Sequence, residues 1–136
     1  MIESMNKTCS KCQTPKDISE FSFYTKSGYA AECRQCHRDA NNKRNRFFRV
    51  KVLTHYGGSP PTCACCGIQN LEFLSLDHIH GGGGKQRKTI KIRWWEWLLK
   101  NKLPEGFRVL CHNCNQSIGL YGYCPHVQYS KLSVES

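Results

Sequence analysis

The stretch that decides the fold is Leu71-Glu72-Phe73-Leu74-Ser75-Leu76-Asp77-His78-Ile79-His80. Its apolar residues alternate with polar ones, which predicts a half-buried strand that ends in an acid and two histidines. Further along the chain comes Phe107-Arg108-Val109-Leu110-Cys111-His112-Asn113-Cys114-Asn115. This segment predicts a second short strand, then a metal-binding knuckle of the form Cys-x-x-Cys, then an asparagine directly after it.

Another knuckle, formed by Cys63 and Cys66, lies upstream of both strands. Two such knuckles can share one zinc ion. A zinc ion shared by the two knuckles would bring Asp77, His78 and Asn115 together. Carboxylate and amide oxygens suit a hard divalent ion such as Mg²⁺, and a histidine beside such an ion can act as a general base. We therefore expect the chemistry of the chain in this region.

The chain is rich in cysteine, with ten cysteines in 136 residues. A chain this short needs such staples. Its first residues are polar and lack the apolar segment of a signal peptide. We therefore expect an intracellular, cytoplasmic setting, where disulfides are disfavoured. Eight cysteines form four Cys-x-x-Cys pairs typical of two structural zinc ions: Cys9 and Cys12, Cys33 and Cys36, Cys63 and Cys66, Cys111 and Cys114.

Two cysteines remain outside these pairs. Cys65 lies inside the second knuckle; we interpret it as a spare thiol, although a pairing through Cys65 instead stays open. Cys124-Pro125-His126 is interpreted as a structural wrap. The alternative is a third metal half-site, for which Cys65 and scattered histidines are the remaining partners.

The charge of the chain points to a polyanionic partner. Lysine and arginine number 20 against 10 acids, a formal charge of +10. Two four-cysteine zinc sites would lower it to about +6, since the thiolates outweigh the ions they bind. A basic surface favours nucleic acid. No stretch approaches the roughly 20 apolar residues of a membrane helix, so we expect DNA as the partner and no membrane.

The expected fold is a small α+β protein stapled by zinc. Residues 1–40 would form a four-cysteine module that resembles a zinc ribbon or treble clef. A helix is predicted over 37–56, ended by Gly57-Gly58, and its part within 41–57 would be a basic linker. Residues 58–126 would form the second zinc-pinned domain, and residues 127–136 a loose tail.

Apolar residues predict two local cores. In the first module a hairpin turn at Ser27-Gly28 is expected, with an aromatic core formed by Ile18, Phe21, Phe23, Tyr24 and Tyr29. In the linker helix, Phe47, Val50 and Leu53 with Thr54 recur at helical spacing and should form the packing face.

The segment between the two strands of the second domain contains Gly81–Gly84, predicted as a flexible loop, and a helix predicted over 90–102. Proline at position 104 would end this helix. Its tryptophans are expected in the core. Trp95 faces away from the others, so it would be the freest to stack on a base.

Two basic stretches flank the expected site. Residues 34–51 and 85–102 each contain seven lysines and arginines and one acid. A charge run is usually a solvated face, but beside a phosphate-chemistry site these side chains are candidates for DNA contact: Lys43, Arg44, Arg46, Arg49, Lys85, Arg87, Lys88, Lys91 and Arg93.

Residues 50–126 resemble the HNH (ββα-metal) endonucleases. The resemblance is carried by Leu76-Asp77-His78-Ile79-His80, by Gly81–Gly84 and by Val109-Leu110-Cys-x-x-Cys-Asn115. It is closest to the zinc-containing phage branch that includes recombination endonuclease VII. It implies a ββα-metal catalytic domain, an enzyme of phage or mobile-element type such as a homing endonuclease, and a place in an infected or bacterial cell.

The resemblance also implies roles for individual residues. Asp77 and Asn115 would hold one catalytic Mg²⁺ or Mn²⁺, and His78 would deprotonate the attacking water. An imidazole must be neutral to do so, and activity should therefore fall in acid. His80 would contact the scissile phosphate, with an ordinary surface histidine as the alternative. The products would carry 5′-phosphate and 3′-hydroxyl ends.

The motif departs from the commonest family pattern in two places. Asn115 stands where many members have histidine. The endonuclease VII branch also has asparagine at this position. The middle asparagine of the family name has no clear counterpart. Three alternatives stay open: a non-catalytic zinc protein that binds DNA, a resolvase of four-way junctions, and either a monomer or a homodimer.

Overall fold

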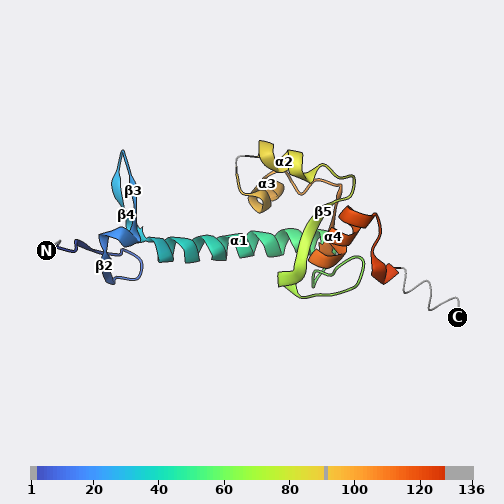
Figure 1. Ribbon diagram of the computed structural model, residues 1–136, viewed down its shortest axis with the longest axis horizontal. Coiled ribbons are helices and arrows are strands. Elements are labelled where there is room, and N and C mark those ends of the chain that lie inside the picture. The colour runs from blue at the N-terminus through green and yellow to red at the C-terminus, as the bar shows by residue number, and fades with distance from the viewer. Residues whose placement is uncertain (1–2, 91, 128–136) are drawn as a thin grey trace. The chain divides into compact units, whose positions relative to one another are not determined.

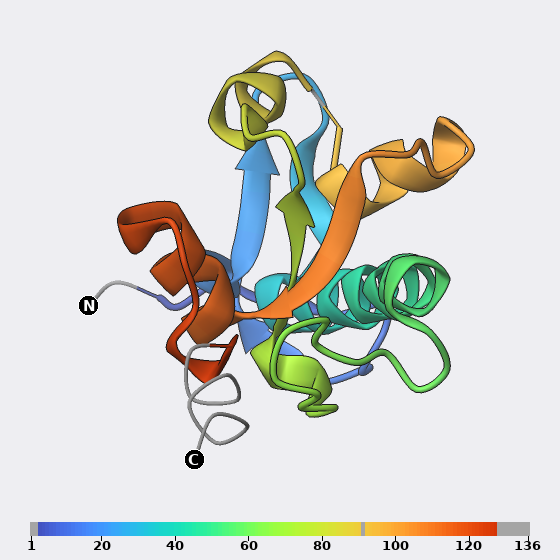
Figure 2. The same ribbon diagram turned by 90° about the vertical axis from the view of Figure 1, so that its right-hand side faces the viewer.

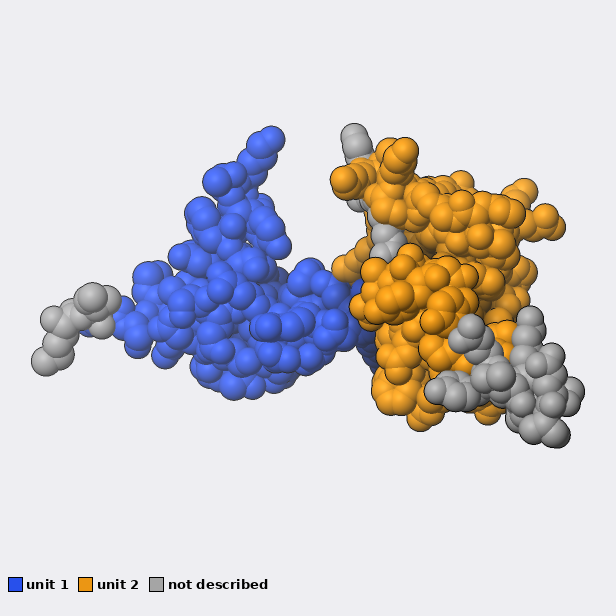
Figure 3. Space-filling view, turned by 45° about the vertical axis from the view of Figure 1, so that its right-hand side comes forward, with its two compact units in different colours: residues 1–46 blue, residues 47–136 orange. Residues whose placement is uncertain are grey.

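The computed structural model describes residues 3–90 and 92–127. The chain is a small α+β protein that divides into two compact units, residues 1–46 and 47–136 (Figure 3). Each unit contains a two-stranded hairpin that leads directly into a helix. Among the described residues, no helix is long and apolar enough to cross a membrane.

The first unit contains two antiparallel hairpins. Strand β1 (Asn6–Thr8) pairs with β2 (Pro15–Asp17), and a 3-10 turn, η1 (Ile18–Glu20), leads into the next hairpin. Strand β3 (Phe21–Tyr24) pairs with β4 (Gly28–Cys33). Gly28 has a φ of +77°, which explains the glycine at the predicted turn.

The predicted aromatic core of the first unit is only partly correct. Phe21 is 1% exposed, but Phe23, Tyr24 and Tyr29 are 59%, 52% and 44% exposed. The register of the hairpin shifts between Phe21 and Phe23, so the two rings do not share one buried face. Phe21 packs with Cys9 and Cys33, and the other rings lie on the surface. Phe23 and Tyr29 instead pack edge to face on the surface.

Helix α1 (Arg34–Gly57) begins directly after β4, three residues before the predicted start. The early start places Cys36 in the first turn of the helix. The predicted packing face is partly wrong: Val52 and Leu53 are buried, but Phe47 is 56% exposed beneath the ammonium group of Lys51. The end at Gly57-Gly58 agrees with the prediction, and Gly58 has a φ of +90°.

The second unit is built on the hairpin of β5 (Leu74–His78) and β6 (Phe107–Cys111), followed by α4 (His112–Tyr121) (Figure 1). The hairpin lies between α4 and the end of α1 (Figure 2). One strand face contributes Leu74, Leu76 and Val109 to a core with Val52 and Leu53. A Cβ at Gly57 would lie 2.8 Å from Cγ2 of Val109, so the end of α1 packs directly against β6.

The segments around the hairpin differ from their predictions. The long predicted strand is shorter, because η2 (Leu71–Phe73) is a 3-10 turn. The predicted loop and helix are instead α2 (Gly83–Thr89) and α3 (Trp94–Lys100), separated by extended backbone at Ile90. Trp95, predicted as the freest tryptophan, is half-buried and packs against the core. All three tryptophans lie in α3, and Trp94 packs against Phe107 of the hairpin.

Candidate functional site: two cysteine clusters and an Asp-His-Asn site

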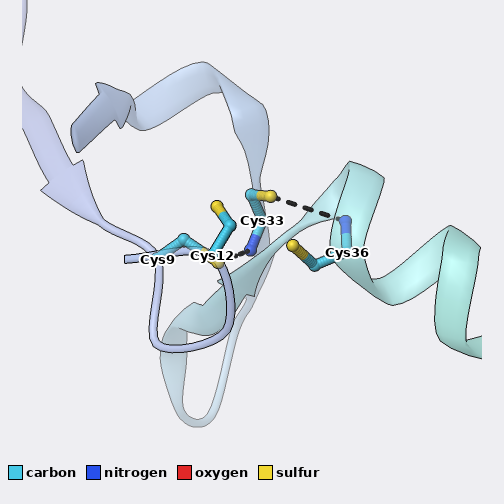
Figure 4. A group of neighbouring side chains, drawn as sticks. All are labelled: Cys9, Cys12, Cys33 and Cys36. Atoms are coloured by element: carbon cyan, nitrogen blue, oxygen red, sulfur yellow. Dashed lines mark hydrogen bonds between the residues drawn. The ribbon is translucent and has the colours of Figure 1, made fainter. Parts of the chain in front are cut away.

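Four cysteines of the first unit point toward one another (Figure 4). Sulfur atoms of Cys9, Cys12, Cys33 and Cys36 all lie within 4.8 Å of one another. Backbone N–H groups bind two of them: Cys33 donates to Cys9 Sγ at 3.2 Å, and Cys36 donates to Cys33 Sγ at 3.5 Å. Four thiolates form a closed tetrahedral set without an open position, so the cluster could hold a structural zinc ion.

The second unit repeats this arrangement with Cys63, Cys66, Cys111 and Cys114. Cys111 N–H donates to Cys63 Sγ at 3.2 Å, and Cys114 N–H donates to Cys111 Sγ at 3.4 Å. Tetrahedral Zn–S bonds of ~2.3 Å place two sulfurs roughly 3.8 Å apart. The Cys66 and Cys111 sulfurs are 3.8 Å apart, so this set also fits zinc.

The hydrogen bonds favour the thiolate form that zinc binds. Burial raises the pKa of Cys9, but the N–H groups of Cys33, Cys12 and Lys11 outweigh burial and lower that pKa to about 6. Equivalent N–H groups around Cys63 do the same and also lower its pKa to about 6. In the same sets the neighbouring Cys33 raises the pKa of Cys36 to about 12 and burial raises the pKa of Cys114, so the N–H groups favour the thiolate at Cys9 and Cys63 and not at every ligand.

The two cysteines left over in the sequence do not stand alone. Cys65 and Cys124 lie beside Cys114, together with His126. Cys124 is 4% exposed, and Cys65 is half-buried. Cys65 is therefore neither isolated nor freely exposed, and the segment predicted as a wrap returns to the second cysteine cluster.

Asp77 lies near the end of β5 and pairs across the hairpin with Arg108. Arg108 Nε donates to Asp77 Oδ2 at 2.9 Å, and the side chains are 38% and 20% exposed. A carboxylate has two oxygens, so Oδ1 is left to face another group. Sequence reasoning missed Arg108, because only the strand register identifies the partner of Asp77.

Asn115, in α4, packs against the strand face that carries Asp77. It follows Cys114 in the first turn of α4, and its Nδ2 donates to Ser75 Oγ at 3.2 Å. Ser75 Oγ in turn donates to Leu110 O at 2.9 Å. Residues 75 and 77 of β5 share one face, because side chains alternate along a strand. The predicted pair of oxygen ligands is therefore placed on one side of the hairpin.

By the same alternation His78, the last residue of β5, lies on the strand face opposite Asp77, where it packs against the segment that contains α2 and α3. Its Nε2 lies 2.8 Å from Gln86 Oε1, its ring stacks on Trp94 with centroids 5.4 Å apart, and Phe107 contacts its edge. With the amide oxygen of Gln86 as acceptor, Nε2 carries the proton and Nδ1 keeps its lone pair. A Cβ at Gly83 would lie 2.6 Å from Nδ1, so Gly83 packs closely against the imidazole and no larger residue fits at this position.

Other predicted site residues are placed less favourably. His80 is exposed and lies in the turn after β5, outside the paired strands. Arg49 Nη2 donates to Leu71 O and Leu74 O at 2.7 and 2.6 Å, so this side chain holds the chain before β5 rather than facing solvent as a DNA contact. Arg93 is half-buried.

The remaining predicted DNA contacts are on the surface or outside the described residues. Lys85 and Lys88 are exposed on α2, the helix that contains Gln86. Exposed positions also include Lys43, Arg44 and Arg46 of α1. Lys91 and the side chain of Arg87 lie outside the described residues.

Comparisons with models of protein families, with curated proteins and with solved structures find no match to this chain.

Proposed function

We propose that the chain is a metal-dependent HNH (ββα-metal) DNA endonuclease that leaves 5′-phosphate and 3′-hydroxyl ends. The observation that supports this most is the hydrogen bond from Asn115 to Ser75. It holds the asparagine of α4 against the strand face that carries Asp77, on a hairpin followed by a helix. This is the arrangement that the resemblance implies for a ββα-metal site on a treble-clef-like zinc frame.

The two units differ at the positions proposed here as oxygen ligands on this frame. In the first unit His37 follows Cys36 in the place where Asn115 follows Cys114, and β3 has the sequence FSFY, without an acid. A carboxylate and an amide oxygen suit Mg²⁺ or Mn²⁺, whereas four thiolates suit zinc. The first unit therefore fits a structural or DNA-contacting role, and the second fits catalysis.

Asp77 and Asn115 would hold the divalent ion. The bound ion would neutralise charge on the phosphate and on the departing 3′ oxygen. Asp77 can keep its bond to Arg108 through Oδ2 and offer Oδ1 to the ion. Asn115 donates through Nδ2 to Ser75, which leaves its carbonyl oxygen for the same ion.

His78 would take the proton of the attacking water through Nδ1. Its bond to Gln86 favours the tautomer in which Nε2 is protonated and Nδ1 is basic. Gln86 would thereby orient the proposed base. Exposed Lys85 and Lys88 on the same helix would bind DNA phosphates close to the site.

A non-catalytic DNA-binding protein is the competing function. The ion pair between Asp77 and Arg108 favours it, because a carboxylate that only braces a strand needs no metal. The two functions differ in whether the Asp77 carboxylate binds a divalent ion, and this can be measured directly.

The proposal predicts nicking of supercoiled plasmid that requires Mg²⁺ or Mn²⁺, with zinc already bound. Asp77→Asn should abolish nicking and also Mn²⁺ binding, measured from the electron paramagnetic resonance of free Mn²⁺. Arg108→Gln is the matched control, because it removes the same ion pair but keeps the carboxylate. If both variants lose Mn²⁺ binding, or if neither does, Asp77 is not the proposed ligand. If the wild type binds DNA but cuts neither plasmid nor a four-way junction, the competing function is favoured.

A pair of glycines in α2 tests the position of the proposed base. Gly83→Ala should lower nicking by about 100-fold, the scale of a ~1 Å misplacement at a reacting group, because its methyl would lie 2.6 Å from His78 Nδ1. Gly84→Ala adds the same methyl to the same helix, where nothing lies within 4 Å. It should keep wild-type activity and gain roughly 0.5–1 kcal/mol of stability. Equal rates for the two variants would refute this placement of the base.

A further inference from the structure

Three side chains outside the second four-cysteine set lie around one of its members. The ligand atoms of Cys65, Cys114, Cys124 and His126 are all within 4.8 Å of one another. The Nδ1 atom of His126 is 3.3 Å from the sulfur of Cys114 and 3.3 Å from that of Cys124. Tetrahedral bonds of ~2.3 Å to sulfur and ~2.0 Å to nitrogen place those atoms roughly 3.5 Å apart. The spacing therefore matches a three-cysteine, one-histidine zinc site.

The backbone brings these residues together from three places. Cys65 lies in the knuckle, and Cys114 lies in the first turn of α4. Gly122 ends α4 in the left-handed conformation with a φ of +78°, and its N–H donates to Ile118 O. This C-terminal cap reverses the chain, so that Cys124 returns to the helix start and is buried.

Cys114 belongs to both sets of ligands. The first set is Cys63, Cys66, Cys111 and Cys114, and the second is Cys65, Cys114, Cys124 and His126. A thiolate sulfur has more than one lone pair and can bind two zinc ions at once. Each ion would then have four ligands, the number that a structural zinc site requires.

We propose that the second unit binds two zinc ions bridged by the Cys114 thiolate, so that the full chain holds three. All ten cysteines then become zinc ligands. The second ion ties the turn after α4 to the knuckle and fixes the first turn of α4 from a second side. This site is independent of the proposed nuclease activity, since the metal count can be measured without a substrate.

Native mass spectrometry of the full chain, purified with zinc under reducing conditions, tests the proposal. The expected result is three zinc ions per chain, one for each four-residue set. A chain that binds two zinc ions and has two thiols that react with Ellman's reagent would overturn the proposal. Two zinc ions with a mass lower by about 2 Da would also overturn it, because loss of two hydrogens indicates a disulfide between Cys65 and Cys124.

Point variants test the assignment of ligands. Cys65→Ser and His126→Ala should each bind two zinc ions tightly and release the third to the chelator 4-(2-pyridylazo)resorcinol. His55→Ala, an exposed histidine of α1, is the control and should keep three. Tryptophan emission from α3 should stay unchanged in all of them, which separates metal loss from unfolding. Three tightly held ions in Cys65→Ser would show that the ligand set is wrong.

Discussion

Replacing Cys9 with serine should unfold the hairpins of the first unit. Among the described residues of that unit, the buried core consists of Cys9, Phe21 and Cys33, with Cys36 packed against it. Burial of a phenylalanine contributes about 1.5–3 kcal/mol, whereas binding of structural zinc contributes ~10–16 kcal/mol in small domains. The zinc term dominates by several-fold, so loss of one ligand should remove the fold rather than weaken it.

Amide chemical-shift dispersion in a two-dimensional NMR spectrum measures this loss for residues 6–33. Phe23→Ala is the matched control in the same unit, because this ring is 59% exposed and contributes little to the core. The second unit has its own core, and its tryptophans should keep their emission in Cys9→Ser. Cys111→Ser should have the reverse pattern, with the tryptophan emission shifted. Dispersed amides in Cys9→Ser would show that protein contacts alone hold the first unit.

The two four-cysteine clusters could be predicted from the sequence because each half of a cluster is a local pattern. A Cys-x-x-Cys knuckle places two sulfurs on one turn whatever surrounds it. The knuckle at Cys111 follows a strand and the knuckle at Cys33 follows another, so each hairpin and its helix follow from short patterns. The pairing of knuckles agrees with the two four-cysteine sets.

The predictions that failed concern side chains whose burial depends on segments distant in the sequence. Hydrophobic spacing cannot show that Phe23 faces solvent and Phe21 faces the cysteines, because the core of the first unit is too small for both. The split of the predicted helix into α2 and α3 also depends on tertiary contacts, since Trp94 packs on His78 and Phe107. Periodicity alone does not contain those contacts.

The candidate site divides in the same way. Asp77, His78 and Asn115 could be named because they adjoin a strand end and a knuckle. Arg108 and Gln86 could not, because one depends on strand register and the other on the fold of the segment after the glycines. A register prediction for the hairpin, counted back from Cys111, would have found Arg108 opposite Asp77.

His78→Ala should lower metal-dependent nicking by about 10²–10⁴-fold, the usual contribution of a positioned general base. The fold should persist, because the His78 side chain is half-buried and the hairpin core is made by Leu74, Leu76 and Val109. DNA affinity and Mn²⁺ binding should be unchanged, since neither requires the imidazole. The rate of plasmid nicking at saturating Mn²⁺, beside a gel-shift titration, measures both.

The companion variants decide what a loss of activity means. Gln86→Ala removes the acceptor 2.8 Å from Nε2 and should lower the rate by less than His78→Ala, because the ring remains but its tautomer is no longer held. His80→Ala, two residues further in the exposed turn, separates a base at His78 from a general need for histidine. If His78→Ala nicks as fast as the wild type while Asp77→Asn does not, the ion is catalytic and the base is another group. If all four variants and the wild type bind DNA without nicking it, the Asp-His-Asn constellation serves to brace the hairpin.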